Sequence, residues 1–312
     1  MMKNTILLVL VCVLFAISGR AQQDPQYTQY MYNMSVINPA YATDDPEMLN
    51  IGGIYRAQWM SIDGAPRTAS FFVHTPLSKK VEMGLSVVND EIGNIVNETN
   101  AYVDFAYVLS ISSKSRLSFG LKAGATFYDT DFSDFTLIDD LPDPSFAENI
   151  SRVLPNVGAG VYYFSDNYYV GLSVPNFLKS KHIENQDGVS YQAVEDYHFF
   201  LTGGYVFDLN ENVKFKPAFM TKAVFDVPMS FDLTANFLFN NRVEMGAAYR
   251  WDDAVSGLIN FRITPSLKMG YAYDYTISNL GNYNSGSHEF MILFDINKLG
   301  KNKGFDVSPR FF

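Results

Sequence analysis

The chain has 312 residues, a formal net charge of −10 at pH 7, and 26 phenylalanines and 20 tyrosines but only 2 tryptophans. So acidic a chain lacks the basic surface with which proteins displace counterions from nucleic acid, and nucleic acid is therefore excluded as an expected partner. Hydrophobic residues make up 47% of the sequence. Beyond the N-terminus, however, no apolar stretch approaches the roughly 18 residues typical of a membrane-spanning helix.

Residues 1–21 are predicted to be a secretory signal peptide. Lys3 supplies the positive end, residues 5–17 form an uncharged apolar run, and Gly19 and Ala21 precede the expected cleavage site. The alternative, a permanent membrane anchor, is disfavoured because a spanning helix takes about 20 apolar residues. The single cysteine, Cys12, lies within this run. The mature chain is therefore expected to have no disulfide, no thiol catalyst and no cysteine metal site.

Residues 22–48 are predicted to form a separate segment before the first strand. They contain tyrosines at positions 27, 30, 32 and 41, and prolines whose neighbours favour extended or turn conformations. This composition is too apolar for a free linker, so we expect the segment to pack against the domain that follows. The candidate partner-binding residues, including two at the other end of the chain, are Gln26, Tyr27, Thr28, Gln29, Tyr30, Asn38, Pro39, Tyr41, Phe311 and Phe312.

Residues 49–297 alternate repeatedly between apolar and polar positions. In residues 117–127, one set of alternate positions is apolar, while the other carries Ser118, Gly120, Lys122, Gly124 and Thr126. Because successive side chains of a strand point to opposite faces, each such stretch has one apolar and one polar face. We count about 14 stretches, which start near residues 49, 67, 81, 99, 115, 156, 168, 196, 212, 228, 242, 254, 266 and 287.

The length and even number of these stretches predict an all-β fold, a transmembrane antiparallel up-and-down β-barrel. A tilted strand crosses a bilayer in about 9–11 residues, and bacterial single-chain barrels have even strand numbers. A soluble β-sandwich is the alternative, since it also alternates. The sequence disfavours it because aromatic residues occur near the segment ends, as in interfacial girdles: Trp59, Tyr128, Phe239, Trp251 and Tyr275.

The connections between the stretches are predicted to alternate in length. Short turns are expected near residues 77–80, 112–114, 165–167, 210–212, 240–242 and 264–266, and longer loops at 90–98, 129–155, 177–194 and 277–285. Outer-membrane barrels have their short turns in the periplasm. The pattern therefore predicts the cell outer membrane as location, with membrane lipids around the barrel and both termini in the periplasm.

The polar faces carry charges of both signs. The basic side chains are Lys122, Arg250, Arg262 and Lys268, and the acidic ones are Asp104, Asp232, Glu244, Asp274, Glu289 and Asp295. We expect these residues to pair with one another and to fill the barrel interior. A selective pore is the alternative. Residues 22–48 are expected either to fold into this lumen as a plug or to lie against the periplasmic rim.

No catalytic, cofactor-binding or metal-binding constellation is predicted. The four histidines lie on separate segments without metal-ligand spacing, and the nucleophile-elbow, phosphate-loop and dinucleotide motifs are absent from the sequence. The acidic residues between positions 129 and 143 carry oxygen ligands suited to Ca²⁺. Their spacing misses the EF-hand pattern, and a solvated surface loop is the favoured interpretation.

The last expected strand, around residues 290–296, precedes a basic, glycine-containing stretch that begins at Lys298. Residues 298–312 form a predicted tail, which ends in Phe311 and Phe312. Two interpretations stay open: a disordered tail, or a periplasmic docking peptide with a terminal aromatic anchor.

Several stretches along the mature chain resemble the PorP/SprF family of outer-membrane proteins. They include Asp24-Pro25-Gln26-Tyr27-Thr28-Gln29-Tyr30-Met31, Ile37-Asn38-Pro39-Ala40-Tyr41-Ala42, Tyr55-Arg56-Ala57-Gln58-Trp59, Asp63-Gly64-Ala65-Pro66, His74-Thr75-Pro76-Leu77, Gly84-Leu85-Ser86-Val87-Val88-Asn89-Asp90, Val170-Gly171-Leu172-Ser173-Val174-Pro175-Asn176 and Tyr283-Asn284-Ser285-Gly286-Ser287-His288-Glu289.

The resemblance implies a non-enzymatic component of the type IX secretion system of Bacteroidota. Family members work with the periplasmic ring and motor of that system, and some serve the secretion or surface anchoring of one partner protein, such as a large adhesin in gliding motility. The implied partners are therefore ring or translocon proteins and a secreted surface protein. The alternative function is an outer-membrane channel or transporter for small solutes.

Overall fold

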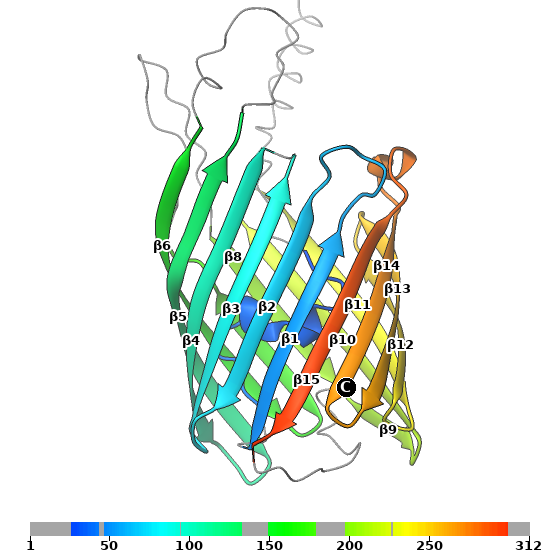
Figure 1. Cartoon of the computed structure of the whole chain (residues 1–312). Helices are drawn as coiled ribbons and strands as arrows, with labels where there is room; N and C mark the ends of the chain where they lie inside the picture. Colours follow the sequence, from blue (N-terminus) through cyan, green and yellow to red (C-terminus); the bar gives the residue numbers. More distant parts are fainter. Residues whose placement is uncertain are drawn as a thin grey trace, which may run out of the picture.

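The computed structural model describes residues 26–43, 47–93, 95–132, 149–178, 197–225 and 227–298. These residues form fifteen β-strands in one sheet (Figure 1). The strands are β1 Met48–Ala57, β2 Arg67–Pro76, β3 Val81–Ile92, β4 Val96–Ser110, β5 Ser115–Thr130, β6 Ser151–Ser165, β7 Tyr168–Val174, β8 His198–Tyr205, β9 Phe207–Asn210, β10 Val213–Val224, β11 Val227–Phe239, β12 Val243–Arg250, β13 Ala254–Thr264, β14 Leu267–Thr276 and β15 Ser287–Asn297.

The sheet closes on itself. The first strand β1 pairs antiparallel with the last strand β15, with Met48 opposite Asn297 and Ala57 opposite His288. Sequence neighbours pair around the ring, and β10 pairs with both β8 and β11. The predicted antiparallel up-and-down barrel is thus confirmed. Closure satisfies the backbone hydrogen bonds that an open sheet edge would leave unpaired in lipid.

The fifteenth strand arises because one strand of a fourteen-strand barrel is interrupted. Both β8 and β9 pair with β10, and their registers belong to one continuous series: Ala218 lies opposite Gly204 and Phe215 opposite Phe207. The gap between the two registers falls at Lys216 and Pro217 of β10. Proline has no backbone N–H to donate, so it interrupts a β-ladder at such a point. Counting β8 and β9 together, the predicted number of strands is confirmed.

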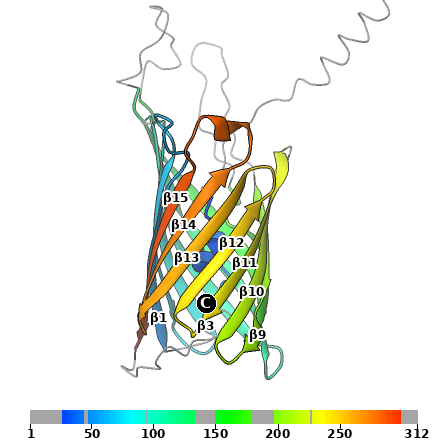
Figure 2. The same cartoon turned by 90° about the vertical axis from the view of Figure 1, so that its right-hand side faces the viewer.

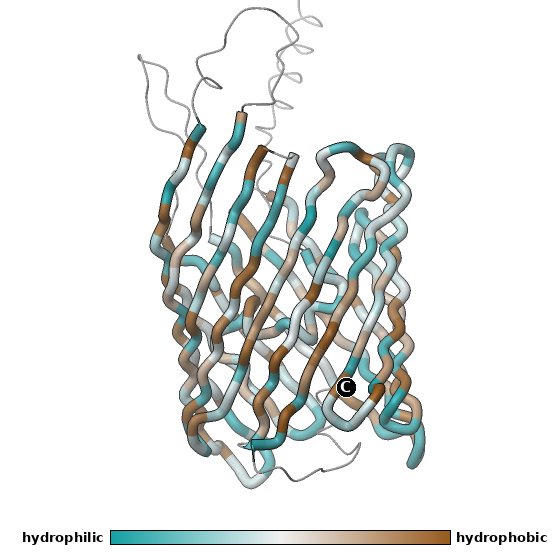
Figure 3. Tube along the Cα trace, in the orientation of Figure 1, coloured by the Kyte–Doolittle hydropathy of each residue, from teal (hydrophilic) through white to brown (hydrophobic). Residues whose placement is uncertain are grey.

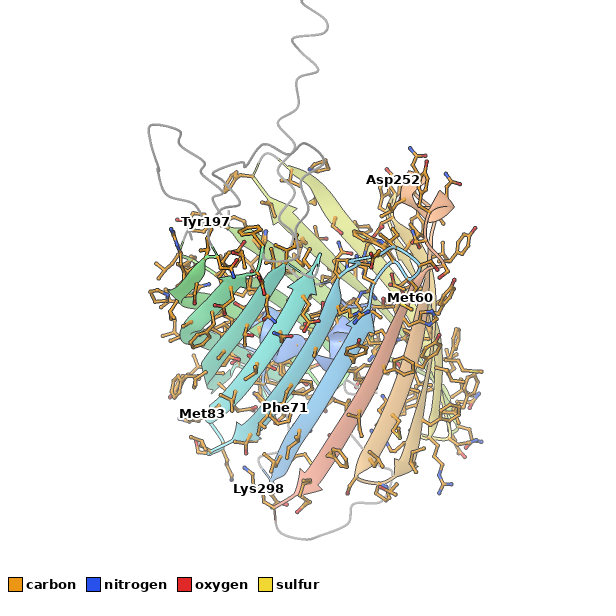
Figure 4. The ribbon with its side chains drawn as sticks, turned by 45° about the horizontal axis from the view of Figure 1, so that its top comes forward. Met60, Phe71, Met83, Tyr197, Asp252 and Lys298 are labelled. Atoms are coloured by element: carbon orange, nitrogen blue, oxygen red, sulfur yellow. The ribbon has the colours of Figure 1, made fainter. Side chains whose placement is uncertain are left out.

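The barrel is apolar outside and polar inside. On β5, Leu121 is 65% exposed, whereas its neighbour Lys122 is 2% exposed. Hydrophobic and hydrophilic residues alternate along the strands (Figure 3), and Phe71 lies on the outer surface (Figure 4). A sandwich would bury its apolar face between two sheets, so this inverted arrangement excludes the soluble alternative and fits a barrel surrounded by lipid.

The two ends of the barrel differ in their connections. At what we call the short-turn end lie the connections after β2, β4, β6, β9, β11 and β13; at the long-loop end lie those after β1, β3, β5, β7, β10, β12 and β14. Met60 and Asp252 lie at the long-loop end, while Met83 and Lys298 lie toward the short-turn end (Figure 4).

The expected long loop at residues 90–98 is wrong. Strands β3 and β4 pair from Asp90 opposite Glu98 up to Ile92 opposite Val96, which leaves residues 93–95 as the connection. The polar residues Asp90 and Glu91 continue the ladder there, and Gly93, at φ +69°, supplies the left-handed backbone conformation of the turn. The expected strand starts at residues 99 and 156 were late, since β4 begins at Val96 and β6 at Ser151.

Residues 26–43 lie inside the barrel, where Figures 1 and 2 show them crossing the interior. We call them the lumen strap. The strap contains a 3-10 turn, η1 Tyr30–Tyr32, and one short helix, α2 Met34–Ile37; a further 3-10 turn, η3 Asn279–Asn282, lies at the long-loop end. Within the described ranges, no helix is long and apolar enough to cross a membrane.

The lumen strap supplies much of the apolar packing inside the barrel. Its buried hydrophobic residues cluster with inward-facing wall residues, among them Ile54, Tyr162, Phe164 and Met291. Burying one large apolar side chain contributes about 1.5–3 kcal/mol. The strap therefore replaces, within an otherwise polar interior, part of the hydrophobic core that a soluble domain would have.

Candidate functional site

The interface between the lumen strap and the barrel wall is the most elaborate polar arrangement in the described residues. At its centre, Glu289 of β15 accepts the backbone N–H groups of Thr28 and Gln29 at 2.8 and 2.7 Å. Arg56 of β1 lies 3.2 Å from the same carboxylate. Because Glu289 is fully buried, its charge is balanced by these donors instead of by water.

The side chain of Thr28 extends the same cluster. Its hydroxyl donates to Asp274 at 2.7 Å and accepts from Arg56 at 3.1 Å. Arg56 also pairs with Asp274 at 2.6 Å. Three wall residues on β1, β14 and β15 thus hold two consecutive residues of the strap. Charge-assisted hydrogen bonds of this kind are stronger than those between neutral groups.

Tyr32 forms a second polar contact with the wall. Its hydroxyl donates to Glu244 and accepts from Lys268 at 2.8 Å. Lys268 also lies 4.0 Å from the centre of the Tyr32 ring, within cation–π range. The hydroxyl thus connects an acid and a base that come from two different strands, β12 and β14.

The short helix α2 is held by its carbonyl groups. Lys122 of β5 donates to the carbonyl oxygens of Ser35 and Val36 at 3.2 and 2.8 Å, and Ser173 of β7 donates to that of Ile37 at 2.8 Å. The last carbonyls of a helix have no partner within the helix. The wall supplies donors for them from two different strands.

Two glycines on adjacent strands make room for the turn at Pro39. Gly120 of β5 and Gly160 of β6 face each other in the ladder. A Cβ on Gly120 would lie 2.2 Å from the carbonyl carbon of Pro39, and one on Gly160 would lie 2.1 Å from Oδ1 of Asn38. Real Cβ atoms do not approach so closely. At Gly120 the clash is with backbone atoms, so only glycine fits there, whereas at Gly160 a Cβ would require the Asn38 side chain to shift.

The strap then continues toward β1. The ring of Tyr41 lies 5.3 Å from that of His74 and 5.7 Å from that of Tyr162. The backbone N–H of Thr43 donates to Glu82 of β3 at 2.8 Å. This end of the strap is thus fixed near the short-turn end, where β2 ends and β3 begins.

The lumen charges pair with one another, as the alternation predicts. The pairs between residues expected to face the lumen are Arg250–Asp232 at 2.7 Å, Lys268–Glu244 at 2.8 Å, Lys122–Asp104 at 3.7 Å and Arg262–Asp295 at 3.7 Å. Sequence reasoning missed Arg56, the partner of Asp274 and Glu289. It also missed Gly120 and Gly160 as contact positions. The signal for Arg56 was its place between the outward-facing Tyr55 and Ala57.

A cavity lies between the strap and the wall. Its wall residues include Lys222, near the end of β10, Arg250, at the end of β12, and Pro175, just after β7. These positions put the cavity on the long-loop side of the strap. Gln26, Tyr27 and Tyr30 of the strap line its other side.

The structure places eight of the ten sequence-predicted site residues in the lumen strap, spread along its course from the long-loop side to the short-turn side. Arg250 donates to Gln26 at 3.1 Å, Asn38 donates to the carbonyl of Val161 at 3.2 Å, and Tyr27 and Tyr30 belong to the buried apolar cluster. In this arrangement they contact the protein's own barrel, and their binding of a partner stays a prediction. Phe311 and Phe312 lie outside the described residues, as do Asp134, Asp139, Asp140 and Asp143 of the acidic stretch.

Within the part of the chain that the structure describes, no group of three or more His, Cys, Asp or Glu side chains could hold a metal ion. The acidic lumen residues are instead paired with Arg, Lys or backbone N–H groups of the strap. The wall side chains at this interface therefore bind a polypeptide segment, residues 26–43 of the chain itself.

A family model described as type IX secretion system membrane protein PorP/SprF matches residues 19–294. No curated protein matches the sequence.

Three of the solved structures similar to this chain are the following. Omp33, an outer-membrane protein of Acinetobacter baumannii, is 10% identical, with a TM-score of 0.46, and the match covers 81% of this chain and 100% of that one. A FadL homologue of Pseudomonas aeruginosa is 10% identical, with a TM-score of 0.47 and coverages of 89% and 96%. The monoaromatic hydrocarbon channel CymD is 10% identical, with a TM-score of 0.48 and coverages of 84% and 91%.

Proposed function

The chain belongs to the PorP/SprF family of type IX secretion system membrane proteins, and on this premise we propose that it is a non-enzymatic outer-membrane component that supports secretion or surface anchoring of a partner protein, such as a large adhesin. The observation that carries the proposal is the occupied lumen. Its ionisable wall residues bind the strap and one another. Several of them hydrogen-bond backbone N–H and C=O groups of the strap, as side chains that bind a polypeptide do.

The proposed organisation of the chain follows from this role. Residues 1–21 are a signal peptide that is removed on export, residues 22–48 act as a plug, residues 49–297 form the barrel, and residues 298–312 form a periplasmic tail. Phe311 and Phe312 at the end of the tail are proposed to contact ring or translocon proteins. Support comes from Lys298, which leaves the barrel at the short-turn end next to Glu47, and short turns face the periplasm in outer-membrane barrels.

Deleting the gene from its host tests the proposed role. We expect one or a few large surface proteins to disappear from the cell surface, while the rest of the surface proteome stays constant, because the proposed component serves a specific partner. The measurement is quantitative mass spectrometry of proteins shaved from intact cells, with the wild-type gene restored as control. An unchanged surface proteome would refute the proposal.

The second candidate, a channel for small solutes, draws on the cavity at the long-loop side of the strap. The strap argues against it, since residues 26–43 fill the interior with buried side chains at mid-height. Conductance of the purified full-length barrel in planar bilayers separates the two candidates. A steady, solute-sized open conductance in the wild type would favour the channel.

A further inference from the structure

One strand of the barrel wall stops short at the long-loop end. Strand β6, at the left of Figure 1, pairs with β5 along its whole length, from Ser151 to Ser165. On its other side it pairs with β7 only as far as Ala159, which lies opposite Val174. The part of β6 at residues 151–158 therefore extends toward the long-loop end beyond the strand that covers the rest of it.

The chain leaves the barrel wall after β7 and turns to the inner side, where Gly158 of β6 leaves room for it. A Cβ on Gly158 would lie 2.2 Å from the carbonyl oxygen of Pro175, so Pro175 packs directly against the inner face of β6. Pro175 and Asn176 also line the cavity beside the strap. The next residue returns to β6 for one bond, from the N–H of Phe177 to the carbonyl of Val157 at 2.7 Å.

The backbone groups beyond that bond face an unpaired edge. In an antiparallel strand, the N–H and C=O of one residue point to the same neighbouring strand, and the direction alternates along the chain. The carbonyl of Val157 points to the β7 side, whereas that of Ile150 points to β5, where it accepts the last N–H of the strand at 2.8 Å. Three residues therefore face away from β5, and no described residue pairs with them there: Ser151, Val153 and Pro155. We call them the free edge of β6.

The proline at position 155 fits an edge that is open on one side. Proline has no N–H to donate, and within sheets it is confined to positions where no neighbouring strand needs that N–H. Pro155 lies opposite Ala125 of β5, and the β5 ladder loses no bond because residue 155 faces the other way. In a strand paired on both sides, the same proline would leave a carbonyl of its neighbour without a donor.

The outer surface beside the free edge is apolar. Val153 is 62% exposed and Val157 is 44% exposed, and Phe127, opposite Val153 on β5, is 43% exposed. The outward positions of β6 from 151 to 157 are Ser, Val, Pro and Val, without a charge. Proteins commonly protect an exposed strand edge with charged side chains, and an apolar edge without them is a template for pairing with another chain.

We infer that the free edge of β6 binds an extended segment of the secreted partner protein by strand addition. The edge presents backbone N–H and C=O groups at the spacing of a β-ladder, and the backbone of another polypeptide matches them. Alternate apolar side chains of that segment lie beside Val153 and Val157. The edge is at the long-loop end, and outer-membrane barrels have their longer loops outside the cell. The inference rests on the proposed function, because it identifies where the partner contacts the barrel.

Site-specific photocrosslinking in the host tests this contact. A photoreactive benzoylphenylalanine replaces Val153 in one variant and Val255 in the other. Val255 also lies at the long-loop end and is 46% exposed, but its strand β13 is paired on both sides there. We expect the surface partner to crosslink to position 153 and not to position 255. Any other pattern, including crosslinks from position 153 to the barrel's own chain alone, would overturn the inference.

A proline on the free edge provides a second readout. Val153→Pro removes the N–H that faces the partner, whereas the β5 ladder keeps all its bonds because residue 153 faces away from β5. Val153→Ala is the matched control, since it shortens the side chain but keeps the N–H. We expect Val153→Pro to retain about threefold to tenfold less surface partner than Val153→Ala, the effect of one main-chain hydrogen bond. Equal retention by the two variants would also overturn the inference.

The amount of retained partner is divided by the amount of folded barrel in the outer membrane, so that a folding defect is not read as a binding defect. If Val153→Pro does not fold, crosslinking at position 153 decides the question. Failure here is distinguishable from failure of the proposed function. If gene deletion removes the partner from the surface but position 153 does not crosslink to it, the function stands and only the free edge is lost as its site.

Discussion

At the scale of single residues, Glu289 is the strongest link between the strap and the wall. It holds two consecutive backbone N–H groups of the strap and also balances Arg56. Glu289→Ala would leave the buried Arg56 charge with one carboxylate partner and both N–H groups unpaired. We expect the variant to lose about 3–5 kcal/mol of unfolding free energy, as broken buried ion pairs do. Urea unfolding in lipid vesicles, followed by tryptophan fluorescence, measures the change.

The matched control is the exposed pair between Lys214 and Asp208, at 3.0 Å. Asp208→Ala removes a carboxylate of the same chemistry from a site that water reaches. Exposed pairs contribute about 0–1 kcal/mol, so this variant should unfold almost like the wild type. Equal effects of the two substitutions would mean that Glu289 does not hold the strap as described.

Gly120 leads to a second prediction at the residue scale. Gly120→Val would place side-chain atoms against the backbone of Pro39 and Ala40, which cannot move aside as a flexible side chain would. We expect a loss of about 1–3 kcal/mol, typical of overpacking, together with faster proteolysis within residues 26–43. Limited proteolysis of the folded barrel and urea unfolding provide the two readouts.

Gly257 supplies the control for that substitution. It lies on β13, and a Cβ added there would meet no other atom within 4 Å. Gly257→Ala should change the unfolding free energy by no more than about 0.5 kcal/mol, as for substitutions away from packed sites. If Gly120→Val proved as mild as Gly257→Ala, the close contact between β5 and the strap would be wrong.

Alternation predicted the orientation of residues within strands but not the contacts between distant segments. It predicted that Lys122 and Glu289 face inward, because each lies in an uninterrupted alternating stretch. Tyr128 was predicted as a girdle residue but faces the lumen, at 8% exposure, since the alternation of β5 continues past Phe127. The contacts of Arg56 with Thr28 and Glu289 depend on how the strap folds, which no local period encodes.

At the scale of elements, the strands were predictable and the strap was not. Each strand carries its own alternating pattern of apolar and polar residues. The interruption between β8 and β9 is explained by Pro217 on the neighbouring strand β10. The strap has no period, since its η1 and α2 turns are three and four residues long. Its composition predicted burial, but its direction across the barrel depends on wall residues from strands far apart in the sequence.

Deleting residues 26–43 is the prediction for the strap as an element. The wall would keep its ladder but lose the segment that fills its centre, so we expect conductance in planar bilayers to rise well above that of the full chain. Gly120→Val, which only shifts the strap, should raise it less. A folded deletion variant with wild-type conductance would show that the strap does not close the lumen. Retained heat-modifiable mobility on gels verifies the fold.

At the scale of the whole molecule, the stability of the barrel depends on what contacts its outer and inner faces. Its outer face consists of exposed aromatic and aliphatic side chains, including Phe119, Leu121 and Leu172, and its interior of paired charges and the strap. Water cannot stabilise such an exterior, whereas the polar interior is covered by the strap. The apolar outer face of the barrel therefore fits a lipid environment, while its polar inner face contacts residues 26–43 of the same chain.

A depth-dependent cost of charge on the outer face follows from that arrangement. Leu121 lies at mid-height on β5 and is 65% exposed, while Ile111 is 58% exposed in the short turn after β4. Leu121→Arg places a charge in the hydrocarbon centre and should cost about 2–4 kcal/mol of folding free energy, whereas Ile111→Arg at the interface should cost about 0–1 kcal/mol. Folding into vesicles across a urea series measures both. In a detergent micelle, whose surface adapts around the charge, the difference should shrink. Equal costs in vesicles would mean that the membrane does not cross the barrel at the height of Leu121.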